Sequence, residues 1–274
     1  MTTPPDRQTS IASVLTTEIR FGRADLHVET DRGEGANDLP SILERIERRA
    51  ELDIVAIADR DRIESGLEAR AIAERDHLGF EVVPGLLVTT ADGPLLGLWL
   101  DQVIAPGRAA AETVATIHEH GGLAIIVHPF ARWRRSIGQR VVEHLLASED
   151  RSVHPDAIQI TSGSGRASAG AGRALELNAS RYHLPEIGAS NAVFAERIAS
   201  AYTLFPGTLR RGERSSELRT AIENGTARAS RGRRAPLRRL GWRRVAEQRT
   251  REVRFASRRT VPSWLDRLTT GGSR

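Results

Sequence analysis

The chain has 274 residues, a formal net charge of +5 and no cysteine. The lack of cysteine excludes disulfides, thiolate metal sites and a cysteine nucleophile. The N-terminus has no signal-peptide pattern, and the apolar runs, such as residues 123–127, have the length of strands, so we expect a soluble cytoplasmic protein. A chain of this length can form one large α/β domain, or such a domain with an appendage.

The basic residues are unevenly distributed along the chain. All 40 of them are Arg, which indicates a compositional bias rather than a particular partner. Residues 208–274 hold 19 Arg against six acidic residues, a net charge of +13, which leaves about −8 for residues 1–207. The sequence therefore predicts an acidic body followed by a basic extension.

Strand-like and helix-like segments alternate after residues 1–18, which are expected to form a loose arm. Short segments rich in Val, Ile and Leu predict buried strands at 53–59, 80–90, 94–100, 123–129, 156–161 and 201–205. Amphipathic segments between them predict helices at 38–52, 62–79, 108–122 and 171–184. This alternation favours a parallel sheet or a βα barrel.

Residues of metal-ligand type gather where the predicted strands end. In "ADLHVET" (24–30), Asp25, His27 and Glu29 alternate with apolar residues, so their side chains should point to one face of a strand. Further polar residues end other predicted strands, namely Asp59, Asp61 and His128, or lie in the segment "IGASNAV", namely Ser190 and Asn191. In a βα barrel such strand ends line the active site, so these side chains should converge.

Taken in order, these motifs resemble the PHP (polymerase and histidinol phosphatase) family over residues 22–207. The resemblance is carried by "DLHVETDRGEG", "LDIVAIADRDRIESG", "FEVVPGLLVTT", "PLLGLW", "GGLAIIVHPFAR", "DAIQITSG" and "LPEIGASNAVFAERIASAYTLFPG". It implies a distorted seven-stranded βα barrel, related to the TIM barrel. It also implies a family chemistry in which up to three metal ions hydrolyse phosphate esters.

Several metal ligands of the family pattern are replaced in this chain. In the opening motif His27 stands, Glu29 replaces a second His, and Glu34 is the acid that precedes Gly. In the motif that reads "ADRD" here, Asp59 remains but Arg60 replaces a metal-binding His.

The remaining family positions are also altered. The Glu that bridges two metals has become Leu87, and a His has become Pro94. His128 is retained, whereas Asn191 and Val193 replace an Asp and a His.

These replacements argue against a multinuclear metal site. Leu87 offers no lone pair, and Arg60 is a permanent cation where a cation would bind, because a guanidinium does not deprotonate in proteins. We expect Arg60 to form an ion pair with Asp59, Glu29 or Asp61 instead.

Two interpretations of the remaining site stay open. The first is a weak or vestigial site for one divalent cation (Mg, Mn or Zn), with ligands drawn from His27, Glu29, Asn191, Asp25, Glu34 and Asp59. The second, which we favour, treats His27 and His128 as ordinary hydrogen-bonded residues. A basic rim of Arg60, His128 and Arg132 would then hold a phosphate-containing ligand, unless the Arg-rich loop is simply solvated. If the protein is an enzyme, His128 is the candidate acid or base.

The basic extension, residues 231–274, has two further interpretations. Apolar residues are interleaved with Arg there, namely Leu237, Leu240, Trp242, Val245 and Phe255. Such a segment either docks on the acidic body or binds nucleic acid, and we favour docking.

The sequence therefore predicts three parts: an arm (1–18), a PHP-like barrel (19–230) and a basic extension (231–274). The expected function is a phosphoesterase-like protein with an eroded metal site, with little or no hydrolysis, that binds an anionic ligand or a protein partner. The alternative is a metal-dependent phosphatase or nuclease that works through a reduced metal site.

Overall fold

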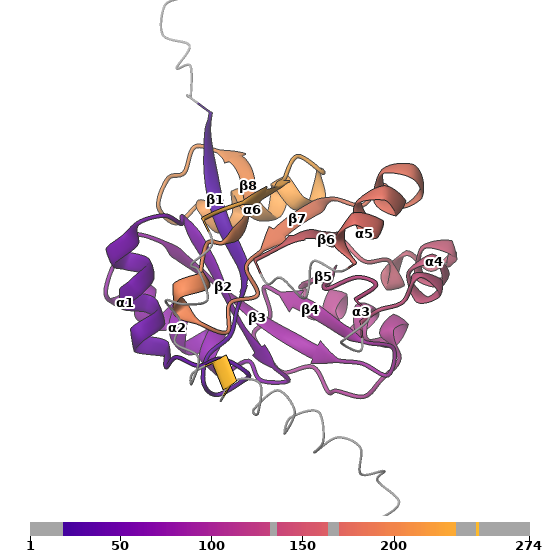
Figure 1. Cartoon of the computed structure of the whole chain (residues 1–274), viewed down its shortest axis with the longest axis horizontal. Coiled ribbons are helices and arrows are strands. Elements are labelled where there is room, and N and C mark those ends of the chain that lie inside the picture. The colour runs from indigo at the N-terminus through magenta and orange to yellow at the C-terminus, as the bar shows by residue number, and fades with distance from the viewer. Residues whose placement is uncertain (1–18, 132–135, 164–169, 234–244, 247–274) are drawn as a thin grey trace, which may run out of the picture.

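The computed structural model describes residues 19–131, 136–163, 170–233 and 245–246 (Figure 1). Its strands are β1 (Arg20–Val28), β2 (Ile54–Arg60), β3 (Glu81–Thr89), β4 (Pro94–Leu98), β5 (Leu123–Ile126), β6 (Ala157–Ser162), β7 (Glu186–Ala189), β8 (Ala201–Gly207) and β9 (Arg228–Arg231). Its α-helices are α1 (Leu39–Arg49), α2 (Glu64–Arg75), α3 (Ala110–Glu119), α4 (Gln139–Ala147), α5 (Ala171–Leu177) and α6 (Arg214–Glu223).

The strands form one sheet in the order β7-β6-β5-β4-β3-β2-β1-β8-β9. β1, β2 and β3 pair in parallel, as do β5, β6 and β7, whereas β4 runs antiparallel to both of its neighbours. The carboxyl ends of β1–β3 and β5–β7 therefore face the same end of the molecule, which we call the mouth.

The sheet has nine strands rather than the predicted seven. The two strands beyond those predicted are β7, which pairs in parallel with β6, and β9, which pairs antiparallel with β8. β9 has the sequence RASR, in which apolar and polar residues do not alternate, so the sequence does not mark it as a strand. It is also partly exposed along its length.

The two ends of the sheet curl toward each other and nearly close a barrel. The hydroxyl of Thr203 in β8 accepts a hydrogen bond from the Gly188 amide at 3.1 Å and donates to the Gly188 carbonyl at 2.9 Å. A Cβ on Gly188 would lie 2.4 Å from the Tyr202 carbonyl oxygen, so glycine permits this close approach. Near the mouth, Val28 forms an isolated parallel bridge with Ala192.

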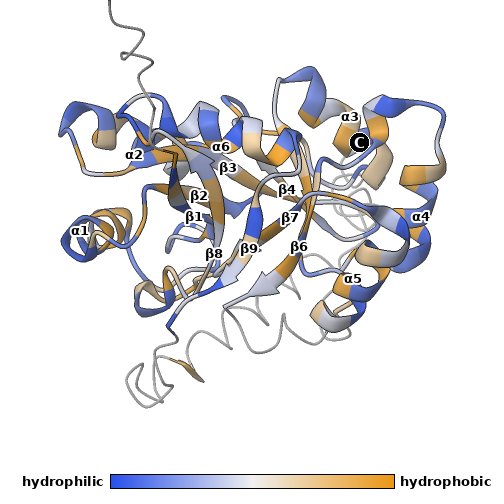
Figure 2. Cartoon of the chain, turned by 90° about the horizontal axis from the view of Figure 1, so that it is seen from above, coloured by the Kyte–Doolittle hydropathy of each residue, from blue (hydrophilic) through white to orange (hydrophobic). Residues whose placement is uncertain are grey.

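The core has an inner part and two outer parts. Alternate residues of β2 divide between them: Ile54, Ala56 and Ala58 pack inside with Phe205 and residues of α6, while Val55 and Ile57 face α1 and α2. The second outer part lies between the sheet and α3, α4 and α5. Figure 2 shows the apolar strands enclosed between these helices. This division follows from the two-residue period of strands.

The predicted elements agree with the observed ones for most of the barrel. The expected strands at 53–59, 80–90 and 94–100 correspond to β2, β3 and β4. The helices α4 and α6 and the strands β7 and β9 were not predicted, because these segments are short or rich in polar residues.

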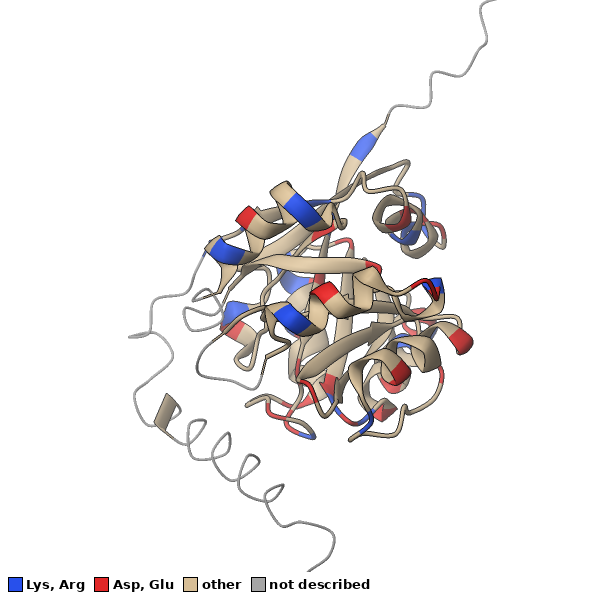
Figure 3. Cartoon of the chain, turned by 90° about the vertical axis from the view of Figure 1, so that its right-hand side faces the viewer, with Lys and Arg blue, Asp and Glu red and all other residues tan. Residues whose placement is uncertain are grey.

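Some predictions concern residues that the structure does not describe. The arm and nearly all of the basic extension, with Leu237, Leu240, Trp242 and Phe255, lie outside the described residues, as does Arg132. In the part of the chain that is described, Figure 3 shows charged residues distributed over the outer helices and loops. No helix in that part is long and apolar enough to cross a membrane.

Candidate functional site

The predicted site residues that the structure describes lie near the mouth, and a bulge in β1 divides Asp25, His27 and Glu29 between two faces of the sheet. The pairing of β1 with β2 shifts by one residue between Asp25 and Val28. Before the shift Asp25 pairs with Val55, an outward-facing residue, and after it Val28 also packs in the outer core. His27 and Glu29 therefore point inward and Asp25 points outward, so the expectation that all three share one face was wrong.

Asp25 connects three segments of the fold. Its carboxylate is fully buried, and it accepts hydrogen bonds from the Ser190 amide (Oδ1, 2.9 Å) and from the Ala199 amide (Oδ2, 2.9 Å). Burial raises the pKa of Asp25, and the hydrogen bonds from Ser190 and Ala199 oppose this shift. Because both of its oxygens bind backbone amides, Asp25 holds the end of β7 and the segment before β8 against β1.

His27 is the least satisfied polar residue of the site. Its ring is fully buried, and neither ring nitrogen forms a hydrogen bond with the described residues. Nε2 lies 3.3 Å from Glu29 Oε1, which is within ion-pair distance but lacks hydrogen-bond alignment. The ring of His128 lies 5.7 Å away between centroids, so the two histidines predicted for the site do meet.

His128 and Asn191 belong to a buried polar network at the ends of β5, β6 and β7. The Asn191 amide nitrogen donates to Ser162 Oγ at 2.6 Å and lies 3.4 Å from His128 Nδ1. Gln159 donates to Asn191 Oδ1 at 3.3 Å, and its own side-chain oxygen accepts from the His128 backbone amide at 3.2 Å. Gln159 was not predicted as a site residue, although a lone amide within the apolar strand "DAIQIT" is a usable signal.

Three residues of the mouth have a left-handed backbone. Asp61, His128 and Asn191 have φ values of 53°, 49° and 51°. Residues other than glycine adopt this conformation at a cost, and such residues cluster at functional sites.

Asp59 is bound to the loop that follows β1. Its carboxylate accepts from the Thr30 amide and from the Thr30 hydroxyl, each at 2.6 Å. Burial raises the pKa of Asp59, hydrogen bonds from Thr30 and Ser65 lower it, and the charge of Glu29 raises it further. Asp59 therefore anchors residues 30–35.

Arg60 forms its ion pair with Glu34, which was not among the expected partners. Arg60 Nε lies 2.6 Å from Glu34 Oε1, and the two side chains are 13% and 8% exposed. Arg60 Nη1 also donates to Thr89 Oγ1 at 3.4 Å. Opposite Arg60 on β3 stands Leu87, which is fully buried in the inner core.

Several of the residues proposed as metal ligands already have protein partners. Of the six residues proposed as ligands, Asp25 and Asp59 have both carboxylate oxygens bound to the protein, and Glu34 is paired with Arg60. Within the described residues, no group of three or more His, Asp and Glu side chains is arranged to hold a metal ion. Among the described residues, His27 and Glu29 have a geometry in which one cation could replace their present contact.

A relative of known sequence identifies the family of this chain. No family model matches it. The uncharacterized protein MJ1587 of Methanocaldococcus jannaschii is 30% identical over an alignment of 131 residues, and the match covers 44% of this chain and 75% of that protein. The chain belongs to the same family as MJ1587. As a member of the MJ1587 family it inherits no assigned activity, because that relative is itself uncharacterized.

Solved structures show which fold the MJ1587-family chain has. One is a two-domain protein from Bacteroides vulgatus ATCC 8482 containing a predicted PHP-like metal-dependent phosphoesterase, with a TM-score of 0.59 and 14% identity, covering 77% of this chain and 65% of that one. Another is PsfC from Pseudomonas syringae PB-5123, with a TM-score of 0.52 and 17% identity, covering 84% and 98% of the two chains. The resemblance to the PHP family is therefore confirmed at the level of the fold.

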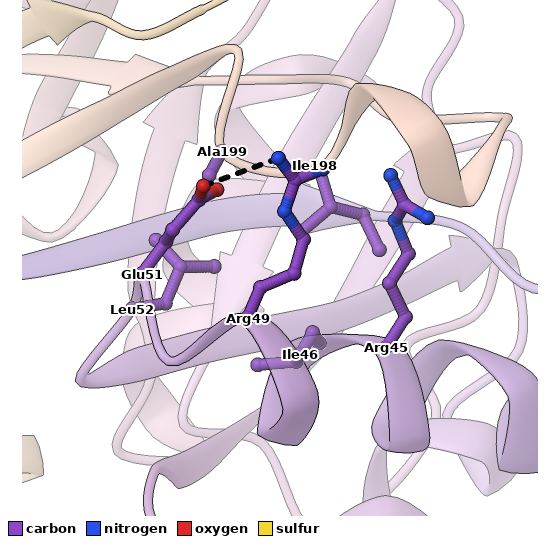
Figure 4. Close-up of a pocket in the computed structure, with 7 residues that line it drawn as sticks. All are labelled: Arg45, Ile46, Arg49, Glu51, Leu52, Ile198 and Ala199. Carbon is purple, nitrogen blue, oxygen red and sulfur yellow. Dashed lines mark ion pairs between the residues drawn. The ribbon is translucent and has the colours of Figure 1, made fainter.

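A shallow pocket lies away from the mouth (Figure 4). Arg45 and Arg49, one helical turn apart on α1, extend beside the loop at Ile198 and Ala199, and Arg49 Nη2 forms an ion pair with Glu51 Oε1 at 3.2 Å. Because Glu51 precedes β2 whereas Arg60 ends it, this pocket lies at the opposite end of that strand from the candidate site.

Proposed function

We propose that this protein binds a phosphate-containing ligand at the mouth of its PHP-like barrel and hydrolyses phosphate esters weakly or not at all. The observation that carries the proposal is the state of the carboxylates. Asp25, Asp59 and Glu34 are already bound to backbone amides, to Thr30 and to Arg60. Because these carboxylates are bound to protein groups, the site offers few free anionic ligands, and two or three divalent cations need several.

Cationic and hydrogen-bonding groups support binding of an anion at the same place. His27 and His128 lie side by side at the mouth, and Arg60 beside them uses Nε for Glu34 and Nη1 for Thr89 out of the five N–H groups of a guanidinium. Imidazole and guanidinium N–H groups both donate hydrogen bonds to phosphate oxygens. The fold adds weight to this choice of ligand, since a structural neighbour contains a domain described as a PHP-like metal-dependent phosphoesterase.

A second candidate function is a phosphoesterase with one metal ion, and one observation favours it. His27 is fully buried with two nitrogens that make no hydrogen bond to the described residues, and such a group costs about 1–3 kcal/mol unless a ligand satisfies it. A single cation between His27 and Glu29 would do so. When bound, it would supply a Lewis acid and an activated water.

The experiment compares the two functions on the full-length protein. Binding of inorganic phosphate and of AMP is measured by calorimetry in the presence of EDTA, and turnover of a phosphomonoester and a phosphodiester is measured with added Mn²⁺. The proposal expects saturable binding that His27→Ala weakens at least tenfold, with turnover at background. His120→Ala, an exposed histidine at the end of α3, is the matched control and should bind as the wild type does.

Each outcome has a defined meaning. Turnover that requires Mn²⁺ and disappears in His27→Ala would replace the proposed function with the one-metal phosphoesterase. No binding of either ligand together with no turnover would refute both.

A further inference from the structure

The guanidinium of Arg60 lies in a nearly dry environment at the mouth. It ends β2, its side chain is 13% exposed, and its Nε atom lies 2.6 Å from Glu34 Oε1. The alternation along β2 places Arg60 on the inner face with Ile54, Ala56 and Ala58. A strand that is otherwise apolar on this face therefore delivers one fixed positive charge to the barrel interior.

Acidic side chains from two loops converge on this charge. The Glu34 amide donates to Glu29 Oε2 at 3.2 Å, which joins the carboxylate paired with Arg60 to the one beside His27. On the other side Thr89, which accepts from Arg60, donates to Asp61 Oδ2 at 3.0 Å. Arg60 thus stands at the centre of a network that connects the ends of β1, β2 and β3.

The geometry of the loop after β1 depends on the same network. Gly35 donates to the Thr30 carbonyl at 2.8 Å, and a Cβ on Gly35 would lie 2.2 Å from the Glu29 carbonyl oxygen. The loop is therefore folded tightly back on itself, and this fold carries the Glu34 carboxylate to Arg60. An ion pair buried to this degree stabilises the arrangement only while both partners are present.

We propose that Arg60 is the resident cation of the mouth: it neutralises and orders the acidic loop, so that the folded protein needs no metal ion. Arginine suits this role because it is always charged and donates several hydrogen bonds in a fixed plane. The same charge repels a divalent cation from the adjacent carboxylates. The substitution Arg60→His, which replaces the guanidinium with an imidazole, is therefore expected to convert the acidic network into a site that binds Mn²⁺.

The test measures the melting temperature of the wild type and of Arg60→His, first in EDTA and then with Mn²⁺. The wild-type value is expected to be the same in both conditions. Arg60→His is expected to melt on the order of 5–10 °C lower in EDTA. The melting temperature of Arg60→His should rise by about 5 °C or more when the Mn²⁺ concentration is on the order of 100 times the Kd of the variant for Mn²⁺. Arg62→His, at an exposed position two residues further along, controls for Mn²⁺ binding by any added histidine.

Two results would overturn the inference. One is a wild-type melting temperature that falls in EDTA and is restored by Mn²⁺, or wild-type protein that carries near-stoichiometric metal after purification. The other is a folded Arg60→His variant that melts like the wild type in EDTA or responds to Mn²⁺ no more than Arg62→His does. If Arg60→His does not fold, the wild-type series and its metal content still decide the question. Because the proposed phosphate binding is measured in EDTA, its failure can be told apart from the failure of this inference.

Discussion

Substitution of Asp25 tests whether this residue joins β1 to the end of β7 and to the segment before β8. The structure gives it two hydrogen bonds to backbone amides, from Ser190 and Ala199, and no exposure to solvent. Asp25→Ala would leave two buried N–H donors without an acceptor, and each such donor costs about 1–3 kcal/mol. The variant also removes a buried charge, and the raised pKa of Asp25 shows that this charge is held at a cost.

We therefore expect Asp25→Ala to lower the free energy of unfolding by about 4 kcal/mol and Asp25→Asn by about 2 kcal/mol, since the amide oxygen can still accept one of the two bonds. For a chain of this size the larger change corresponds to a fall in Tm on the order of 10 °C. Urea denaturation followed by circular dichroism, at neutral pH, measures both variants.

The matched control is Asp31→Asn in the exposed part of the neighbouring loop, which should change the free energy of unfolding by less than about 0.5 kcal/mol. A result within about 1 kcal/mol of the wild type for Asp25→Ala would refute the role of Asp25 as a connection between β1, the end of β7 and the segment before β8.

Two further predictions concern the outer layer and the seam of the barrel. His118 binds the Ser152 carbonyl at 2.7 Å and Asp156 Oδ2 at 2.8 Å; its pKa is raised, chiefly by the bond to Asp156. A raised pKa means that the protonated ring stabilises the fold, so the advantage of the wild type over His118→Gln in urea denaturation should be greatest below about pH 6.5 and shrink as pH rises through the folded-state pKa. An advantage that grows from pH 5.5 to pH 8.5 would contradict this. Thr203→Val keeps the side-chain shape but removes the hydroxyl that bridges the Gly188 amide and carbonyl, so it should cost about 2 kcal/mol and speed hydrogen exchange at Gly188. Unchanged exchange there would show that the hydroxyl does not close the seam.

The fold was largely predictable because its strands carry a strong local pattern. β2, β3 and β4 are apolar runs of the right length, and the order of the motifs indicated the PHP-like fold, which the solved structures confirm. β9 and α6 could not be found in this way, because RASR and RSSELRTAIE are rich in polar residues and are stabilised by neighbours distant in sequence.

That several predicted residues lie close together could be inferred from the sequence, but their contacts could not. Strand ends in a βα barrel converge, so His27, His128 and Asn191 were expected to meet, and they do. The bulge that turns Asp25 outward depends on the register between two strands, which one sequence does not reveal. The pairing of Arg60 with Glu34 depends likewise on how the loop after β1 folds back.

The left-handed backbone at His128 and Asn191 gives a way to compare relatives of this protein. Glycine adopts φ values near 50° without strain, whereas His128 and Asn191 each adopt them at a cost on the order of 1 kcal/mol. Each of these two side chains is therefore retained against a local conformational penalty. A relative that binds a ligand at the mouth is expected to keep both side chains, and a relative with glycine at both positions is expected not to bind that ligand.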